Sequence, residues 1–461
     1  MTNQSNMSDK SPTTNNASLS ELMHESTCPA CGHHVAVTFY RGGSLPLTTQ
    51  AWPQSAQEAH EMPRHPHEFV RCIDCGHVFN REFRYENVPY QTKPNLMYNR
   101  GKTWEAHIER VKQLLLDQLP EVPTVVEIGC GDGTLLCSMA AARPQGRFYG
   151  FDPNAQIETG GGLIEARATL FEPSKHIAEL KPDLIISRHV LEHLMNPLGF
   201  VQQVAFASSW EDAQTKLYIE VPCIDRVFEL NRTIDFYYEH RSHFTSNSLT
   251  KMLERCSSEV EMIATGYNNE VVMGLASFGK ETESIEVAQE AIQFSHGAME
   301  AKNRVRTQLK NLQAAGKRIA IWGGTGKAAS FINQFDLDEK SFPLIVDSDA
   351  AKVGTHVPGM GQKILYRDLL VRQPADVILI ATQWRARDIA MEIESAGIQA
   401  DSLLVEWRGE LIDYHLNADL FDTNRGETLA SKSNKDHRPP ERAPHLFQPF
   451  PETVQQIEDI T

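Results

Sequence analysis

The sequence predicts an α/β protein in which a small metal-binding module precedes two doubly wound sheets in tandem. Two pairs of cysteines near the N-terminus predict the module. Two glycine-rich segments, each between a strand-like run and a helix-compatible run, predict the sheets. At 461 residues the chain also exceeds what one hydrophobic core organises, and about 150 residues per domain give roughly three domains.

Composition and charge exclude several classes of function. The chain is 41% hydrophobic and 23% charged, as ordinary globular proteins are. Its 44 basic and 60 acidic residues leave a net charge of −16, which repels phosphate backbones, so we expect no nucleic-acid partner. No apolar run approaches the ~18 residues of a membrane span, and residues 1–27 lack the apolar core of a signal peptide. We therefore expect a cytoplasmic protein without a membrane partner.

Composition shifts predict the domain boundaries. The N-terminus is rich in Ser, Thr, Asn and Gln, and the C-terminus is polar and rich in proline, so both ends are expected to be disordered. The expected ranges are a leader at 1–25, the metal-binding module at 26–90, an α/β core at 91–280, a helical connector at 281–316, a second, Rossmann-like domain at 317–417 and a tail at 418–461.

The two cysteine pairs are each spaced Cys-x-x-Cys and followed by glycine, at Cys28 and Cys31 and at Cys72 and Cys75. Two such knuckles complete a tetrahedral, closed site, which predicts a structural Zn2+. The alternatives are two unrelated thiol pairs or a redox dithiol. The 40 residues between the pairs must form an inserted hairpin or loop.

A glycine-rich turn follows a predicted helix at 103–118. Val125 and Val126 belong to a buried strand, Glu127 ends it, and a helical run starts after the glycines. The glycines that follow, at positions 129, 131 and 133 (Gly129, Gly131 and Gly133), are spaced G-x-G-x-G rather than in the dinucleotide pattern G-x-G-x-x-G. Glycine lets a ligand approach the backbone closely, so we expect a cofactor here.

An acidic residue ends the next predicted strand. Asp152 lies 23 residues after Gly129, the distance of one helix and one strand. A carboxylate at this place can accept both hydroxyl groups of a ribose, and a helix cap or a turn is the alternative. A further strand is expected at 168–171, and the residue that contacts the adenine stays open.

The segment after the strand at 183–187 contains His189, Glu192 and His193, spaced His-x-x-Glu-His. On a helix this spacing is the inverted zincin pattern of a metallopeptidase. Because no third ligand motif is evident and the glycine-rich turn already assigns this sheet to a cofactor, we favour the edge of the cofactor site, with His189 among the cofactor-binding residues.

A cluster of aromatic, acidic and histidine residues follows the fifth predicted strand at 217–222. Tyr237, Glu239 and His240 lie on a loop at the carboxyl edge of the sheet, where small-molecule chemistry usually occurs. Glu239 could orient a neighbouring imidazole, and His240 could remove a proton near neutral pH. We expect His243 to be structural and Ser246 or Ser248 to cap the following helix.

A second glycine-rich segment follows a helical pattern at 283–315 and a strand at 318–322. Gly324, Gly326 and Ala329 fit G-x-G-x-x-A, and Asp347 lies 23 residues after Gly324. By itself this pattern fits NAD binding. Further strands are expected at 342–346 and 377–381.

Taken together, these motifs resemble the sugar C-methyltransferase family, whose members methylate carbon 3 of 4-keto deoxysugars carried on TDP. The glycine-rich turn itself resembles the first motif of class I S-adenosylmethionine-dependent methyltransferases. The resemblance covers roughly residues 28 to 415 and is carried by the cysteine pairs and by VVEIGCGDGTLL, VLEH, YIEVP, YYEHRSHF, IWGGTGKAASF and VDSDAAKVGTHVPG.

The resemblance implies S-adenosyl-L-methionine as cofactor, structural zinc and a nucleotide sugar as small-molecule substrate. Tyr237, Glu239 and His240 match the family's Tyr-x-Glu-His signature, in which the histidine is the base. The family's upstream active-site tyrosine is matched best by Tyr98, with Tyr90 as the other candidate.

The resemblance further implies that the second Rossmann-like domain binds substrate through Gly324, Gly326 and Lys327, with the lysine at a helix N-terminus suited to a diphosphate. Arg385 and Arg387 are further candidates. We expect a monomeric C-methyltransferase with His240 as the base. The alternatives are an O- or N-methyltransferase on the same scaffold, or a non-enzymatic zinc-module scaffold or ligand sensor.

Overall fold

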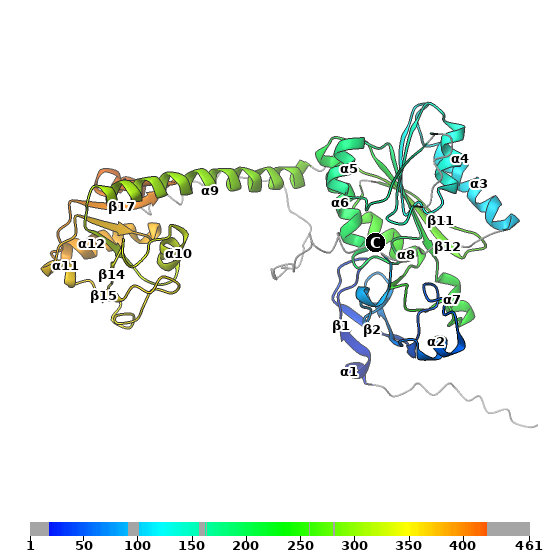
Figure 1. Ribbon diagram of the computed structural model, residues 1–461, viewed down its shortest axis with the longest axis horizontal. Coiled ribbons are helices and arrows are strands. Elements are labelled where there is room, and N and C mark those ends of the chain that lie inside the picture. Colours follow the sequence, from blue (N-terminus) through cyan, green and yellow to red (C-terminus); the bar gives the residue numbers. More distant parts are fainter. Residues whose placement is uncertain are drawn as a thin grey trace, which may run out of the picture. The chain divides into compact units, whose positions relative to one another are not determined.

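The computed structural model describes residues 18–90, 101–155, 162, 164–257, 259–279 and 282–421. These residues form two compact units, the first extending to Ile285 and the second starting at Glu286 (Figure 1). Within the described ranges, no helix combines the length and apolar character needed to cross a bilayer. Of the tail predicted to be disordered at 418–461, residues 418–421 belong to the 3-10 helix η4 (His415–Phe421), so the prediction is wrong for them, and the residues from 422 onward lie outside these ranges.

The first unit begins with a small antiparallel sheet. The hairpin expected between the cysteine pairs is confirmed, because β2 (Val35–Leu45) pairs with β3 (His65–Cys72) across a connection that contains α2 (Ala56–Glu61). The sheet also contains β4 (Val78–Asn80), which is followed by the 3-10 helix η1 (Tyr85–Asn87).

Order begins earlier than the sequence predicts. Residues 18–25 were expected to be disordered, but α1 (Leu19–Leu22) leads into β1 (Met23–Glu25), which pairs with β2. The prediction of a disordered leader is therefore wrong for these residues. Pairing with a neighbouring strand provides backbone hydrogen bonds that composition alone does not reveal.

The small sheet takes its last strand from the segment that holds the predicted base. Strand β10 (Ser242–His243) pairs antiparallel with β4, with Ser242 opposite Phe79 and His243 opposite Val78. Backbone hydrogen bonds thus fix residues 242–243 to the cysteine-containing module.

The larger sheet of the first unit has the order β11-β12-β9-β8-β5-β6-β7 within the described residues. Strands β5 to β9 are parallel, and the β11–β12 hairpin is antiparallel to β9. The bounds are β5 (Thr124–Ile128), β6 (Arg147–Phe151), β7 (Glu165–Arg167), β8 (Leu184–Arg188), β9 (Lys216–Pro222), β11 (Glu259–Gly266) and β12 (Val271–Ser277).

One predicted strand is misplaced. The strand expected at 168–171 lies at 165–167 instead. Phe171 lies in the loop before α5 (Pro173–Leu180). Its ring packs edge-on against that of Phe151, with 5.2 Å between the ring centroids. Tertiary packing therefore explains an apolar run that resembles a strand.

Helices cover both faces of this sheet (Figure 1). Successive strand residues point to opposite sides, so apolar neighbours in a strand contact different helices. Val125 packs with α3 (Lys102–Leu116) and α4 (Thr134–Ala142), whereas Val126 packs with α5, α6 (Pro197–Trp210) and α8 (Ser246–Glu254). Helix α7 (Asp225–Leu230) follows β9. The cap of α8 is Thr245 and not either predicted serine, since its side chain accepts the Ser248 N–H at 3.0 Å.

The second unit contains a sheet of order β15-β14-β13-β16-β17-β18, parallel except for β18. Its strands are β13 (Ile319–Trp322), β14 (Leu344–Asp347), β15 (Ile364–Tyr366), β16 (Val377–Ile380), β17 (Ser402–Trp407) and β18 (Glu410–Asp413). The three predicted strands of this domain are thus confirmed as β13, β14 and β16.

Helices also cover both faces of this second sheet. The C-terminal part of α9 (Thr282–Ala314) and α10 (Lys327–Gln334) pack on one face. On the other lie α11 (Leu369–Arg372), α12 (Ala386–Ser395) and η4 (His415–Phe421), while η3 (Gln383–Arg385) precedes α12. The strand order reverses between β13 and β16, where ligands bind in folds of this kind.

Candidate active site and cysteine cluster

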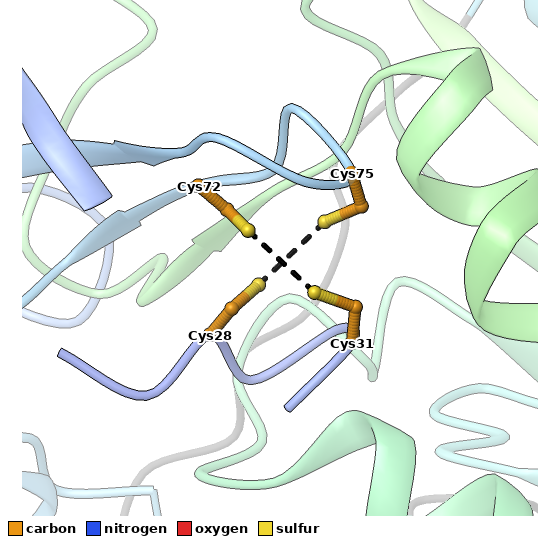
Figure 2. Close-up of side chains that lie close together, drawn as sticks. All are labelled: Cys28, Cys31, Cys72 and Cys75. Atoms are coloured by element: carbon orange, nitrogen blue, oxygen red, sulfur yellow. Dashed lines mark hydrogen bonds between the residues drawn. The ribbon is translucent and has the colours of Figure 1, made fainter. Parts of the chain in front are cut away.

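The four predicted cysteines converge on one centre (Figure 2). Two sulfur–sulfur distances are 3.6 Å, between Cys28 and Cys75, and 3.5 Å, between Cys31 and Cys72, and all four sulfurs lie within 4.8 Å of one another. A tetrahedral zinc site with Zn–S bonds of about 2.3 Å would place its sulfurs about 3.8 Å apart. The donor set and its spacing therefore fit a closed four-thiolate site.

The glycine-rich turn lies between β5 and α4 and has the backbone that its glycines permit. Gly129 has φ +68°, and a Cβ at this position would lie 2.5 Å from Cγ2 of Val190. The carboxylate of Asp152 at the end of β6 accepts the Gly131 N–H at 3.1 Å. Gly133 has φ +70° and precedes the first residue of α4. The turn and the predicted ribose-binding carboxylate are thus neighbours.

A pocket opens at the carboxyl ends of β5, β6 and β8. Gly129, Asp152 and His189 line it, as the sequence predicts for cofactor-binding residues. Gln50, from the connection between β2 and β3, lines it as well. The cysteine-containing module therefore contributes to the wall of the pocket.

Glu127 lies under the glycine-rich turn at the end of β5 and is buried. Burial raises the pKa of its carboxyl group to about 7, although Arg188 acts in the opposite direction. Nη1 of Arg188 lies 3.9 Å from Oε1 of Glu127, and Oε2 has no hydrogen-bond partner among the described residues. Glu127 can therefore change its charge near neutral pH.

A buried ionic network joins the end of β8 to Glu220 on β9. Oε1 of Glu220 lies 3.1 Å from Nε of Arg188 and 3.3 Å from Nε2 of His189, and His107 contacts the other oxygen at 2.8 Å. Burial alone would raise the pKa of Glu220, but these partners hold it well below its ordinary value. Burial opposes charge on His189, yet Glu192 and Glu220 raise the pKa of His189 to about 8.

The metallopeptidase alternative is wrong. His189 has a left-handed backbone (φ +54°), and the segment that follows it is a series of turns. The inverted zincin pattern needs both imidazoles on one helical turn. Here His189 contacts Glu220, whereas Nδ1 of His193 lies 3.1 Å from the hydroxyl oxygen of Tyr90.

His240, the predicted base, contacts one of the two residues that were predicted to lie beside it, Tyr237. Nε2 of His240 lies 3.0 Å from the hydroxyl oxygen of Tyr237. The imidazole is only 8% exposed, and burial lowers its pKa well below the ordinary value, with His193 and His243 acting in the same direction. His240 is therefore neutral near pH 7 and able to accept a proton.

Glu239 does not contact His240 as the sequence suggested. Its fully buried carboxylate instead accepts three backbone N–H groups from the connection between β2 and β3, those of Thr48 at 2.6 Å, Thr49 at 2.7 Å and Gln50 at 3.3 Å. The expectation that Glu239 orients the imidazole is therefore corrected, because the carboxylate holds a loop of the cysteine-containing module.

The sequence analysis ranked one residue of the pocket second, Tyr90, and did not include another, His193, among the site residues. Tyr90 and His193 both line the pocket, and the His193 ring lies 4.8 Å from that of His240. The Tyr90 hydroxyl donates to the backbone oxygen of Glu239. Tyr98, the preferred upstream tyrosine, lies outside the described residues, and Tyr90, the other candidate, lines the pocket. The sequence analysis weighed His193 as a zincin ligand or as a residue at the edge of the cofactor site, and not as a neighbour of the base.

Two neighbours of the base are structural. Tyr238 is fully buried, and its hydroxyl oxygen accepts the Arg84 N–H and an Asn87 side-chain N–H, each at 2.9 Å. Nε2 of His243 lies 3.0 Å from the backbone oxygen of Asp235. The expectation that His243 is structural agrees with this contact.

The predicted substrate-binding residues of the second unit lie where its strand order reverses. Gly326 precedes α10 with φ +58°, and Nζ of Lys327 lies 3.8 Å above the ring of Trp384 in η3. A Cβ on Gly324 would lie 2.4 Å from Cδ1 of Ile364, so this glycine permits packing against β15.

Comparison with known proteins gives two family matches in sequence order. Residues 100–259 match the model of a methyltransferase domain. Residues 268–406 match the model of a C-methyltransferase C-terminal domain. The second match covers most of the unit whose glycine pattern also fits NAD binding.

Among curated proteins, the C-methyltransferase NovU of Streptomyces niveus is 22% identical over 363 residues, which are 72% of this chain and 83% of NovU. Among solved structures, magnesium protoporphyrin IX methyltransferase from Synechocystis PCC 6803, with bound SAH, is 17% identical over 40% of this chain and 91% of its own, with a TM-score of 0.31. A SAM-dependent methyltransferase from Aquifex aeolicus is 14% identical over 39% of this chain and 100% of its own, with a TM-score of 0.28.

The two family matches agree with the order of the folded units and with the motifs at the pocket. The chain is an S-adenosylmethionine-dependent C-methyltransferase that carries a methyltransferase domain and a C-methyltransferase C-terminal domain in series.

Proposed function

We propose that the enzyme transfers the methyl group to a carbon beside the ketone of a nucleotide-linked keto deoxysugar, with His240 as the base. The observation that carries this proposal is a single pocket. Gly129 and Asp152 line it together with His193, whose ring lies 4.8 Å from that of His240. His240 itself is not among the lining residues, so the proposal is that a substrate in this pocket reaches the His240 ring beside His193 while the methyl donor lies at the glycine-rich turn.

The chemistry follows from the protonation state of the pair. A proton beside a ketone is acidic enough for a positioned neutral imidazole to remove, and burial keeps His240 neutral. The Tyr237 hydroxyl holds the ring by its contact with Nε2. The cofactor supplies an electrophilic methyl group. Holding the two reactants together in one pocket contributes much of the rate.

Residues of the pocket support the binding of the donor. Asp152 has its carboxylate at the end of β6, where ribose hydroxyl groups can reach it, and Gly129 leaves room beside Val190. Glu127 and His189 complete the proposed cofactor-binding set with Gly131 and Gly133. In the second unit, Lys327 at the N-terminus of α10 is a proposed anion-binding residue.

We also propose that the four cysteines hold a structural zinc ion. The fit of their spacing to a tetrahedral site supports the metal, and the contact of Glu239 with residues 48–50 gives the module a function. The ion would fix the module that closes the pocket.

Replacing the base tests the proposed function. His240→Gln should abolish methylation of TDP-linked 4-keto deoxysugars while the Kd for S-adenosylmethionine, measured by calorimetry, stays within about twofold. His60→Ala, at an exposed position on α2, is the matched control and should leave both values unchanged. Full turnover by His240→Gln would contradict the proposal.

A further inference from the structure

Glu192 is a buried carboxylate beside the proposed base for which the steps above require no role. It follows β8 and is 1% exposed. Among the described residues, no hydrogen-bond donor reaches either of its carboxylate oxygens, and Nδ1 of His189 lies 3.5 Å from Oε1. His189, whose pKa this carboxylate helps to raise, compensates it on the side of Oε1, and a buried carboxylate is stabilised further by each additional positive charge within reach.

The imidazoles of His193 and His240 lie next to this carboxylate. One carboxylate oxygen of Glu192, one ring nitrogen of His193 and one of His240 all lie within 4.8 Å of one another. Glu239, the acid adjacent to His240 in sequence, accepts three backbone N–H groups on Oε1 and is not part of this group of atoms. Glu192 is therefore the acid whose carboxylate lies closest to the ring nitrogens of His193 and His240 among the described residues of this group.

We propose that Glu192 is a positioning residue that compensates the positive charge formed on His240 when the imidazole takes the substrate proton. This inference rests on the proposed function. In the step concerned, the C–H bond beside the ketone breaks, an N–H bond forms on His240, and the electron pair remains with the substrate as an enolate. The proton leaves His240 for solvent after turnover.

The surroundings of His240 explain why it needs such a partner. Three imidazoles, those of His193, His243 and His189, disfavour a charge on His240, and the Tyr237 hydroxyl facing Nε2 is neutral. Burial acts in the same direction. A carboxylate within about 4–6 Å shifts the pKa of an ionisable group by roughly 1–3 pH units in favour of the charged form.

The test compares Glu192→Gln with His240→Gln in the full-length enzyme, using labelled S-adenosylmethionine and a TDP-linked 4-keto deoxysugar. Glu192→Gln should lower kcat about 100-fold while KM for both substrates stays within about twofold. The acidic limb of its kcat/KM profile should move to lower pH by about 1–3 units. Glu192→Asp should recover part of kcat, and Glu172→Gln, at an exposed acid, should behave as wild type.

The outcomes separate this inference from the function on which it rests. Wild-type kcat in Glu192→Gln, with His240→Gln inactive, would overturn the role of Glu192 alone. Activity in His240→Gln would overturn the proposed function. Loss of cofactor affinity in Glu192→Gln and Glu192→Asp would also overturn the inference, as would a second equivalent of bound metal, beyond the cysteine site, that disappears in Glu192→Gln.

Discussion

The contact between Glu239 and residues 48–50 allows a quantitative prediction about how the cysteine-containing module reaches the active site. Glu239→Gln keeps the size of the side chain but removes its charge. Hydrogen bonds to a charged group contribute about 1.5–3 kcal/mol each, roughly twice the contribution of neutral ones. The two short bonds, from Thr48 at 2.6 Å and Thr49 at 2.7 Å, should together weaken by about 2 kcal/mol.

Hydrogen exchange measured by mass spectrometry on peptides covering residues 46–53 tests this value. Because 1.4 kcal/mol is a factor of ten, the amides of Thr48 and Thr49 should exchange about thirtyfold faster in Glu239→Gln. KM for the acceptor should rise, since Gln50 lines the pocket. Glu58→Gln, at an exposed acid of the same module, is the control. Unchanged exchange together with a shifted pH profile would refute the reasoning, because Glu239 would then act on the base.

Three further predictions concern the cofactor and the metal. Because burial raises the pKa of Glu127 to about 7, its carboxylate gains negative charge as pH rises from 6 to 8. The affinity for the positively charged cofactor, measured by calorimetry, should therefore increase over this range. Glu127→Gln should lose that increase. Gly129→Ala should destabilise the first unit by about 1–3 kcal/mol and abolish cofactor binding, since the new Cβ would meet Val190 and the residue has a positive φ. Gly297→Ala, at a helix position with open space around it, is the control and should not destabilise the protein. Elemental analysis should find one zinc ion per chain in the wild type and none in Cys28→Ser, which should also release residues 48–50, while Cys137→Ser, outside the cluster, should keep the metal. Cofactor affinity independent of pH, wild-type stability of Gly129→Ala, or zinc retained in Cys28→Ser would contradict the respective argument.

Local patterns were sufficient to predict the elements whose chemistry is local. The knuckles of the cysteine cluster, the glycine-rich turn with Asp152, and most strands of both sheets depend on short-range spacing, and the structure has them where expected. The prediction placed strand β7 too late in the chain because it took the apolar Phe171 for a strand residue. Phe171 instead packs against Phe151 from a loop, which only the tertiary structure reveals.

Contacts between distant segments account for what the sequence analysis missed. Glu239 contacts residues about 190 positions earlier in the chain, so its neighbour in sequence, His240, is not its partner. His193 and Glu192 come from the segment after β8, and only the folded chain brings them to His240. Burial decides their chemistry, and single-residue patterns do not encode it.

The position of the transferred methyl group tests the proposed activity most directly. The enzyme is incubated with S-adenosylmethionine labelled with carbon-13 in its methyl group and with TDP-linked 4-keto deoxysugars, and carbon NMR locates the label. We expect a methyl group bonded to the ring carbon beside the ketone. A label found on oxygen or nitrogen would contradict carbon methylation with His240 as the base.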